Sequence, residues 1–202
     1  MTAIVYLPGA SGSRAFWRPV AERLTDLGPA KLFGWPGFGD EPADETVQSV
    51  ADLMRWTLQR LPAGPMDVVA QSMGGVVATL LALAHPERVR RLVLCATSGG
   101  IDVTALGAAD WRPEYSAEFP HVPDWFVVDR TDVSARLTTI TAPTLVLYGD
   151  QDPLCNQRIG SFLAGRVPGA TLTCISGGEH MMARDRPEEI AVAIRKHLMG
   201  VS

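Results

Sequence analysis

The chain has 202 residues, of which 47% are hydrophobic and 20% are charged, and its formal net charge is −4. This composition is typical of one globular domain, residues 1–202, that is large enough to bury a substantial core. The mild acidity, without a basic run or an alternation of aromatic and basic residues, argues against a nucleic-acid partner.

The N-terminal half begins with alternating strand and helix signals. The apolar run 3–7 is typical of a strand covered on both faces, and a small-residue loop follows it over 8–13. Apolar residues at four-residue spacing predict a helix over 15–27. A short strand is predicted over 30–35, and it ends in a loop rich in turn-forming residues over 36–42.

A second helix is predicted over 50–61, because its apolar residues fall on one helical face and Thr46 or Ser49 can cap its start. The next apolar run, 67–70, is of strand type, and the sequence then becomes helix-forming from 73 to about 84. This strand and this helix are separated by only two residues, so the chain must turn sharply between them.

Ser72 lies at that turn, with the small residues Ala70 two places before it and Gly74 two places after it. A strand that turns directly into a helix crowds its own backbone and holds the middle residue in a strained conformation. The N–H groups at the helix start then lie behind the serine oxygen, where they favour negative charge. The stretch therefore predicts a nucleophile at Ser72; the alternative is a buried serine in a small-residue turn.

The C-terminal half repeats the alternation. Strands are predicted over 89–96, 144–148 and 170–175, and helices over 159–167 and 188–198. Strands alternating with helices predict an α/β fold, with a mainly parallel sheet of about six strands and helices on both faces.

Residues 101–139 depart from this pattern, since they contain no clear strand and are rich in Trp, Pro and Asp. We interpret them as an excursion from the sheet made of helices and turns. One interpretation is a short lid over a pocket, with Trp111, Phe119, Trp125 and Phe126 as its aromatic residues. The other is a crossover layer packed on the sheet.

Polar residues follow the ends of three predicted strands. They are Ser72, the pair Asp150 and Asp152, and His180, in that chain order. In parallel sheets, functional sites gather beyond the carboxyl ends of the strands. We therefore expect these side chains to meet.

Cys95, Cys155 and Cys174 are widely spaced and form no C-x-x-C or Cys/His cluster, so the sequence predicts no metal site and no disulfide framework. A reducing cytoplasm is the expected compartment. The N-terminal run lacks a basic leader, and no apolar stretch is long enough to span a membrane, so neither a secretory signal nor a membrane partner is expected.

Five motifs in the right order make the chain resemble the α/β-hydrolase fold family over nearly its whole length. They are Leu7-Pro8-Gly9-Ala10, Gly34-Trp35-Pro36-Gly37-Phe38-Gly39, Ala70-Gln71-Ser72-Met73-Gly74-Gly75, Leu147-Tyr148-Gly149-Asp150-Gln151-Asp152-Pro153, and Gly178-Glu179-His180 with Arg186-Pro187-Glu188. In the family these correspond to the oxyanion loop, the D-x-P-G-x-G loop, the nucleophile elbow, the acid loop and the histidine loop.

The resemblance implies a catalytic triad in which Ser72 is the nucleophile, His180 the general base and Asp152 the acid that orients the histidine. Asp150 is the alternative acid. The resemblance also implies an oxyanion hole made by the backbone N–H groups of Met73 and Ala10, with Gly9 letting the loop approach the substrate.

The remaining histidines, His85, His121 and His197, suit surface or capping roles better than catalysis.

Four departures from the family pattern bear on the substrate. Pro8 replaces a frequent histidine, Gly34-Trp35 stands where an aspartate is common, and Ala70 replaces the first glycine of the elbow. The chain also starts at what resembles the third family strand, without the usual N-terminal strand pair. A sheet with such an exposed edge is compatible with a monomer or with a homodimer that covers the edge.

The resemblance therefore implies a cofactor-free serine hydrolase of carboxylic esters or thioesters with small apolar acyl groups, acting through an acyl-enzyme. Candidate pocket residues are Trp35, Phe38, Trp111, Trp125 and Phe126, each of which is equally compatible with the core. Two alternatives stay open because fold does not determine chemistry. One is C–C bond hydrolysis or lyase chemistry on the same triad, and the other is a non-catalytic ligand-binding or signalling protein.

Overall fold

The computed structural model describes residues 1–201 and contains one six-stranded sheet with the strand order β2-β1-β3-β4-β5-β6. All five neighbouring pairs are parallel, and the pairing of β3 with β1 and β4 places the Ser72 stretch in the middle of the sheet. The predicted α/β class with a mainly parallel sheet is confirmed. The strands are β1 (Ile4–Leu7), β2 (Ala30–Leu32), β3 (Met66–Gln71), β4 (Val89–Cys95), β5 (Thr144–Gly149) and β6 (Thr171–Ile175).

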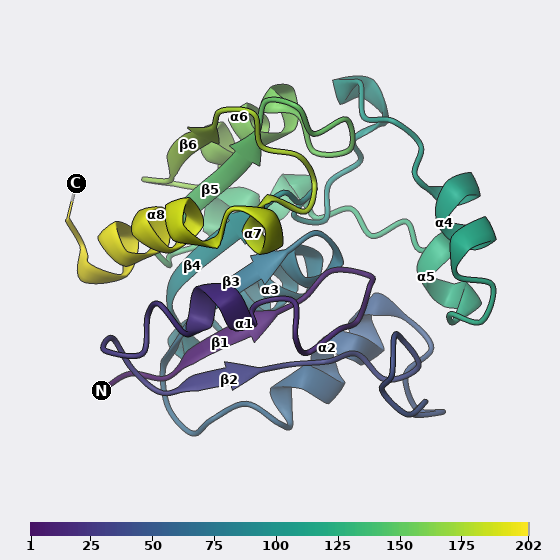
Figure 1. Cartoon of the computed structure of the whole chain (residues 1–202), viewed down its shortest axis with the longest axis horizontal. Coiled ribbons are helices and arrows are strands. Elements are labelled where there is room, and N and C mark those ends of the chain that lie inside the picture. The colour runs from purple at the N-terminus through teal and green to yellow at the C-terminus, as the bar shows by residue number, and fades with distance from the viewer. Residues whose placement is uncertain (202) are drawn as a thin grey trace.

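Helices cover both faces of the sheet, as predicted (Figure 1). The α-helices are α1 (Arg18–Ala21), α2 (Val50–Leu58), α3 (Met73–Ala84), α4 (Arg112–Glu118), α5 (Asp124–Val128), α6 (Gln157–Arg166), α7 (Met182–Asp185) and α8 (Pro187–Met199). The short 3₁₀ helices within residues 1–201 are η1 (Pro86–Arg88), η2 (Thr104–Leu106) and η3 (Ser134–Thr139). Within residues 1–201, no helix combines the length and the apolar character that crossing a membrane requires.

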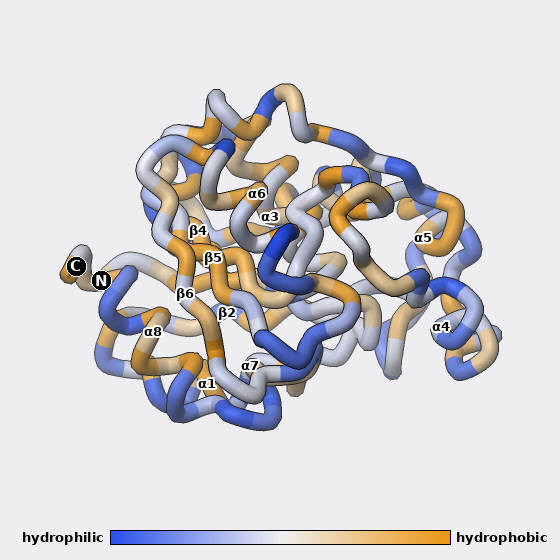
Figure 2. Tube along the Cα trace, turned by 90° about the horizontal axis from the view of Figure 1, so that it is seen from above, coloured by the Kyte–Doolittle hydropathy of each residue, from blue (hydrophilic) through white to orange (hydrophobic). Residues whose placement is uncertain are grey.

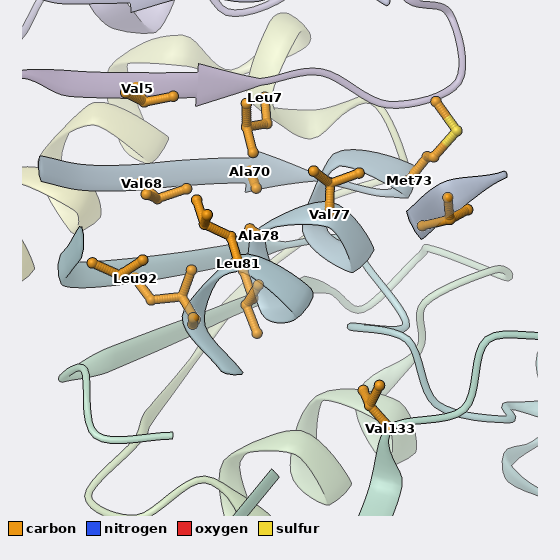
Figure 3. Close-up of a cluster of buried hydrophobic side chains, with 14 of the residues drawn as sticks. Val5, Leu7, Val68, Ala70, Met73, Val77, Ala78, Leu81, Leu92 and Val133 are labelled. Carbon is orange, nitrogen blue, oxygen red and sulfur yellow. The ribbon is translucent and has the colours of Figure 1, made fainter. Parts of the chain in front are cut away.

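Each face of the sheet has its own apolar core. Side chains of β1, β3 and β4 meet α3 on one face, and Figure 3 shows Leu7, Ala70 and Ala78 among the residues of this cluster. The other cluster joins the same strands to α1, α7 and α8. Successive strand residues point to opposite faces, so a strand covered on both faces reads as a continuous apolar run. Figure 2 shows the hydrophobic colour along the central strands and the hydrophilic colour on outer turns of α1 and α8.

The first helix is shorter than the predicted 15–27. Only Arg18–Ala21 is α-helical, and the flanking residues form turns. Pro19 explains the late start, because proline has no backbone N–H and its ring clashes with the carbonyl four residues earlier, so it fits only the first turn of a helix.

The second helix begins where one of its two predicted caps places it. Ser49 is the N-cap of α2, and its hydroxyl accepts a hydrogen bond of 3.0 Å from the Asp52 amide. The helix ends at Leu58, three residues before the predicted end at 61. Near the C-terminus, one helix of the structure is not predicted from the sequence. The helix α7 has only four residues, which is too few to show an apolar repeat.

Residues 101–139, all of which the structure describes, form helices and turns and no strand, as predicted. The segment has two parts. Its end, η3, packs against α3 and α6, whereas α4 and α5 lie beyond the carboxyl ends of the strands, away from the body of the sheet (Figures 1 and 2). The helices α4 and α5 with the turn between them, residues 112–128, are called the cap below.

Candidate active site

The turn from β3 into α3 holds Ser72 in a backbone conformation that few side chains adopt. Its φ of 51° and ψ of −121° lie in a strained region for a residue with a Cβ. Gly74 explains how the turn packs, because a Cβ there would lie 2.4 Å from the Pro8 carbonyl oxygen and 2.5 Å from that of Leu7. Ala70, in contrast, points its methyl group into the buried cluster of Figure 3. The turn therefore needs a glycine on its helix side and accommodates alanine on its strand side.

Ser72, His180 and Asp152 form a continuous hydrogen-bonded array. His180 Nε2 lies 3.1 Å from Ser72 Oγ, and His180 Nδ1 lies 2.9 Å from Asp152 Oδ2. The Asp152 carboxylate is fully buried, whereas the His180 side chain is 20% exposed. A carboxylate at Nδ1 fixes the imidazole tautomer with its unprotonated Nε2 toward the serine, which is the arrangement that accepts the serine proton.

The two candidate acids occupy different environments. Oδ1 of Asp152 accepts hydrogen bonds from the amides of Leu154 and Cys155, at 2.8 and 3.1 Å, which leaves Oδ2 for the histidine. Asp150 is exposed, and its Oδ1 accepts a 2.7 Å hydrogen bond from the Gly177 amide. Asp150 thus joins the acid loop to the histidine loop, and Asp152 is the carboxylate that reaches the imidazole.

Close backbone packing sets the register of these two loops. A Cβ on Gly149 would lie 2.0 Å from the carbonyl oxygen of Gly178, so neither strand end admits a larger residue at this contact. The Gly178 carbonyl also accepts a 3.0 Å hydrogen bond from the Gln151 amide of the acid loop. Since β5 and β6 are hydrogen-bonded neighbours, this packing brings Asp152 and His180 to the same side of the sheet edge.

The loop after β1 passes directly beside the nucleophile turn. A Cβ on Gly9 would lie 2.3 Å from Gln71 Oε1 and 3.0 Å from Ser72 Cβ, so a larger residue would have to displace the Gln71 side chain and would crowd the nucleophile. Among the backbone hydrogen bonds of residues 1–201, neither the Ala10 amide nor the Met73 amide is a donor. Neither amide of the predicted oxyanion hole is therefore committed to a backbone hydrogen bond in this part of the chain.

The predicted pocket residues separate into two groups. Trp35 and Phe38 are fully buried, so they belong to the core rather than to an exposed pocket surface, and the Trp35 indole donates a 2.9 Å hydrogen bond to the Pro8 carbonyl. Trp111, Trp125 and Phe126 are partly exposed. Phe126 stacks on Trp111 with 4.8 Å between ring centroids, and Phe38 meets Trp125 and Phe126 edge to face. Phe38 thus packs between the core and the aromatic residues of the cap.

Sequence reasoning missed the site contacts of Gln71, at the end of β3, and of Thr97, in the loop after β4. Gln71 is buried and donates a 3.2 Å hydrogen bond from Nε2 to the His180 carbonyl. The Thr97 hydroxyl donates a 2.6 Å hydrogen bond to the Ser72 carbonyl. Their positions in the sequence could have indicated these contacts, because Gln71 directly precedes the serine and Thr97 follows the end of β4.

Cys155 places a thiol beside Asp152 and His180, with one ligand atom from each residue within 4.8 Å of the others. Burial raises the pKa of the Cys155 thiol well above its usual value, and the nearby Asp152 carboxylate raises it further. The hydrogen bonds described above already occupy both oxygens of Asp152 and Nδ1 of His180. The cluster is thus accounted for without a metal ion.

The other histidines lie apart from this array. His85 is the C-cap residue of α3, His121 is exposed in the cap, and His197 lies 3.2 Å from the Pro143 carbonyl through Nε2.

Comparison with protein families gives a match to the model described as "alpha/beta hydrolase fold" over residues 2–126. Among curated proteins, the chain is 25% identical to a pimeloyl-[acyl-carrier protein] methyl ester esterase of Neisseria meningitidis, with 98% of this chain and 77% of that protein covered. It is 26% identical to a protein of Caulobacter vibrioides that is provisionally named a carbamate hydrolase, with 95% and 88% covered.

Solved structures show the same fold. A hydrolase from Pseudomonas aeruginosa PA01 superposes with a TM-score of 0.81 at 22% identity, covering 98% of this chain and 89% of that one. The enol-lactonase from Burkholderia xenovorans LB400 superposes with a TM-score of 0.77 at 19% identity, covering 98% and 91%. At these identities the likeness concerns the fold.

Proposed function

The chain belongs to the alpha/beta hydrolase fold family, and on this premise we propose that it is a serine hydrolase that cleaves carboxylic esters or thioesters of small apolar acyl groups. The observation that carries the proposal is the array in which His180 Nε2 lies 3.1 Å from Ser72 Oγ while Nδ1 lies 2.9 Å from the buried Asp152.

In the proposed mechanism, Ser72 Oγ attacks the substrate carbonyl carbon as His180 Nε2 takes the serine proton. The carbonyl π electrons move onto oxygen, and the amides of Ala10 and Met73 donate hydrogen bonds to the resulting oxyanion. When the intermediate collapses, the bond to the leaving alcohol or thiol breaks and His180 returns the proton to it. A water molecule then attacks the acyl-enzyme by the same steps, releasing the acid and regenerating Ser72.

Two features support a small acyl substrate. The cap consists of two short helices, of seven and five residues, so it encloses little volume for a long chain. Its partly exposed aromatic residues, Trp125 and Phe126, and the adjoining Trp111 offer an apolar surface on the side of the sheet where the strands end. The name of the Neisseria relative supports ester over C–C bond cleavage.

The test is turnover of p-nitrophenyl acetate together with covalent labelling by a fluorophosphonate probe. Native protein is expected to hydrolyse the ester and to be labelled at Ser72, and Ser72→Ala is expected to lose both. Ser161→Ala is the matched control, because Ser161 is exposed on α6 and is not part of the array. Native protein that neither hydrolyses ester nor reacts at Ser72 contradicts the proposal and favours a ligand-binding protein with a hydrolase-like site.

A further inference from the structure

We propose that Tyr115 of the cap is a positioning residue: its hydroxyl holds the carbonyl of Ala10 and thereby sets the orientation of the loop whose Ala10 amide binds the oxyanion. The inference rests on the proposed function, since it concerns the same site. It is carried by the 2.8 Å hydrogen bond that the Tyr115 hydroxyl donates to the Ala10 carbonyl across 105 residues of sequence.

Every carbonyl of the loop from Leu7 to Ala10 accepts a hydrogen bond from a different donor. The Trp17 indole binds Leu7 O at 2.9 Å, and the Trp35 indole binds Pro8 O at 2.9 Å. The Gly12 amide binds Gly9 O at 3.0 Å, and Tyr115 binds Ala10 O. Each carbonyl shares a planar peptide unit with the N–H of the following residue, so the bond to Gly9 O fixes the plane that contains the Ala10 N–H. The bond from Tyr115 fixes the next peptide plane, on the other side of the Ala10 Cα, so Ala10 is held between two fixed planes.

These four bonds offer an explanation for the absence of the family histidine at Pro8. A proline has no side-chain donor and no backbone N–H, so this loop cannot be fixed from within at that position. Trp17 and Trp35 are fully buried, and they fix the first two carbonyls from the core. Ala10 is only partly buried, and the donor to its carbonyl comes from the cap.

Tyr115 is held in place by the aromatic residues of the cap and the adjoining Trp111. Its ring lies 5.5 Å from those of Trp111 and Phe126 and 5.0 Å from that of Phe119. Phe126 in turn meets Phe38, 5.9 Å away. Burial raises the pKa of the Tyr115 phenol, and the nearby Glu118 raises it further, so the hydroxyl remains protonated and able to donate.

The aromatic residues and the loop also touch directly. A Cβ on Gly12 would lie 2.2 Å from Phe38 Cβ, so Phe38 contacts both the turn after Ala10 and the cap ring Phe126. The position of the cap is therefore linked to the loop in two ways, by packing through Phe38 and by the Tyr115 hydrogen bond. Of the four donors to the carbonyls of residues 7–10, Tyr115 is the one supplied by the cap.

The consequence concerns the transition state more than substrate binding. An oxyanion donor is effective only within about 2.7–3.1 Å of the developing charge, and small displacements of a reacting group are costly. Removing the Tyr115 hydroxyl should therefore lower kcat about tenfold, with KM changed less than about twofold.

The experiment compares Tyr115→Phe with Tyr6→Phe in the full chain. Both changes remove one phenolic hydroxyl close to the loop, since Tyr6 directly precedes it. The buried Tyr6 hydroxyl, however, has no hydrogen-bond partner among the described residues, so its loss removes no hydrogen bond. With p-nitrophenyl acetate, Tyr115→Phe is expected to lose about tenfold in kcat, and Tyr6→Phe to stay within about twofold of native protein.

A second readout separates positioning from stability. Ser72 Oγ adds to the carbonyl carbon of an alkyl trifluoromethyl ketone while the serine proton passes to His180. The carbonyl π electrons move onto oxygen, and this oxyanion lies in the proposed hole, so the affinity for the ketone reports that hole. The Tyr115→Phe variant should bind it about tenfold more weakly, as kcat falls. Replacing Tyr115 with p-aminophenylalanine restores a donor and should recover part of both losses.

The outcomes distinguish this inference from the proposed function. Native protein that is inactive overturns both. If native protein is active, the inference is overturned when Tyr115→Phe retains kcat and ketone affinity, when it changes KM alone, or when Tyr6→Phe loses as much. If Tyr115→Phe fails to fold, the protein with p-aminophenylalanine at position 115 is measured in its place. Native-like kcat and ketone affinity of that protein support the inference. A tenfold loss in that folded protein, which has a donor at position 115, overturns the inference.

Discussion

Asp152 and His180 are separated by 28 residues in the chain, yet Oδ2 of the aspartate lies 2.9 Å from Nδ1 of the imidazole. Asp150, only two residues away from Asp152, contacts the Gly177 amide instead. The two carboxylates therefore differ in what their loss should do, and this difference gives the first prediction.

Asp152→Asn should lower kcat for p-nitrophenyl acetate by about 10²–10⁴-fold, because an amide at this position no longer stabilises the imidazolium and favours the wrong tautomer. Asp150→Asn is the matched control and should stay within about twofold, because the asparagine side-chain oxygen can still accept the hydrogen bond from the Gly177 amide. Steady-state kinetics on both variants is the measurement. Near-native activity of Asp152→Asn contradicts the proposed role of Asp152.

Gly74→Ala should destabilise the fold and lower activity. The new Cβ would lie 2.4 Å from the Pro8 carbonyl oxygen, and because backbone must then shift, a cost of about 1–3 kcal/mol in unfolding free energy is expected. Gly165→Ala on α6 is the control of opposite sign. No atom lies within 4 Å of a Cβ there, so the higher helix propensity of alanine should stabilise by about 0.5–1 kcal/mol. Urea unfolding of both variants measures the two effects, and a Gly74→Ala protein as stable as native would contradict the packing argument.

Ala70→Gly should destabilise without improving catalysis, although it restores the usual elbow glycine. Ala70 is fully buried in β3, and its methyl group packs in the cluster of Figure 3. Losing that methyl and adding backbone freedom to the unfolded chain should cost about 1–2 kcal/mol. The check is thermal unfolding beside ester turnover: a more stable or clearly more active Ala70→Gly protein would show that the methyl group strains the turn.

His197 should make stability depend on pH. Burial lowers the pKa of this histidine, and the nearby Arg91 cation lowers it further. The folded protein thus binds the proton less tightly than the unfolded chain, whose histidine pKa is about 6.5. The contribution of neutral His197 to the unfolding free energy is therefore complete above about pH 6.5, and it is lost as pH falls toward the lower pKa of the folded protein.

The measurement for His197 is the unfolding free energy of native protein minus that of His197→Gln at several pH values. Glutamine keeps a donor for the Pro143 carbonyl, which His197 contacts at 3.2 Å, but does not titrate. The difference should increase in favour of native protein as pH rises from about 5 to 8. A flat difference would mean that His197 has the same pKa in the fold as in the unfolded chain, and a falling one that its folded pKa is raised.

Much of the fold was accessible to sequence reasoning because its signals are local. Apolar runs covered on both faces located the strands, and alternation with helices predicted a parallel sheet. The errors also have local causes: Pro19 delays the start of α1, and α7 is too short to show a period. The location of Ser72, Asp152 and His180 after strand ends followed from the same order of elements.

By itself, the sequence determined the order of strands and helices, the all-round burial of the central strands and the placement of the candidate site residues at strand ends. The tertiary structure decided which carboxylate reaches His180, that Trp35 and Phe38 belong to the core, and that Gln71 and Tyr115 contact the site. The physical reason is the distance along the chain over which each kind of information acts. Periodicity reports how each segment meets water or a core, whereas a contact such as that between Tyr115 and Ala10 joins residues 105 positions apart and depends on how whole layers pack.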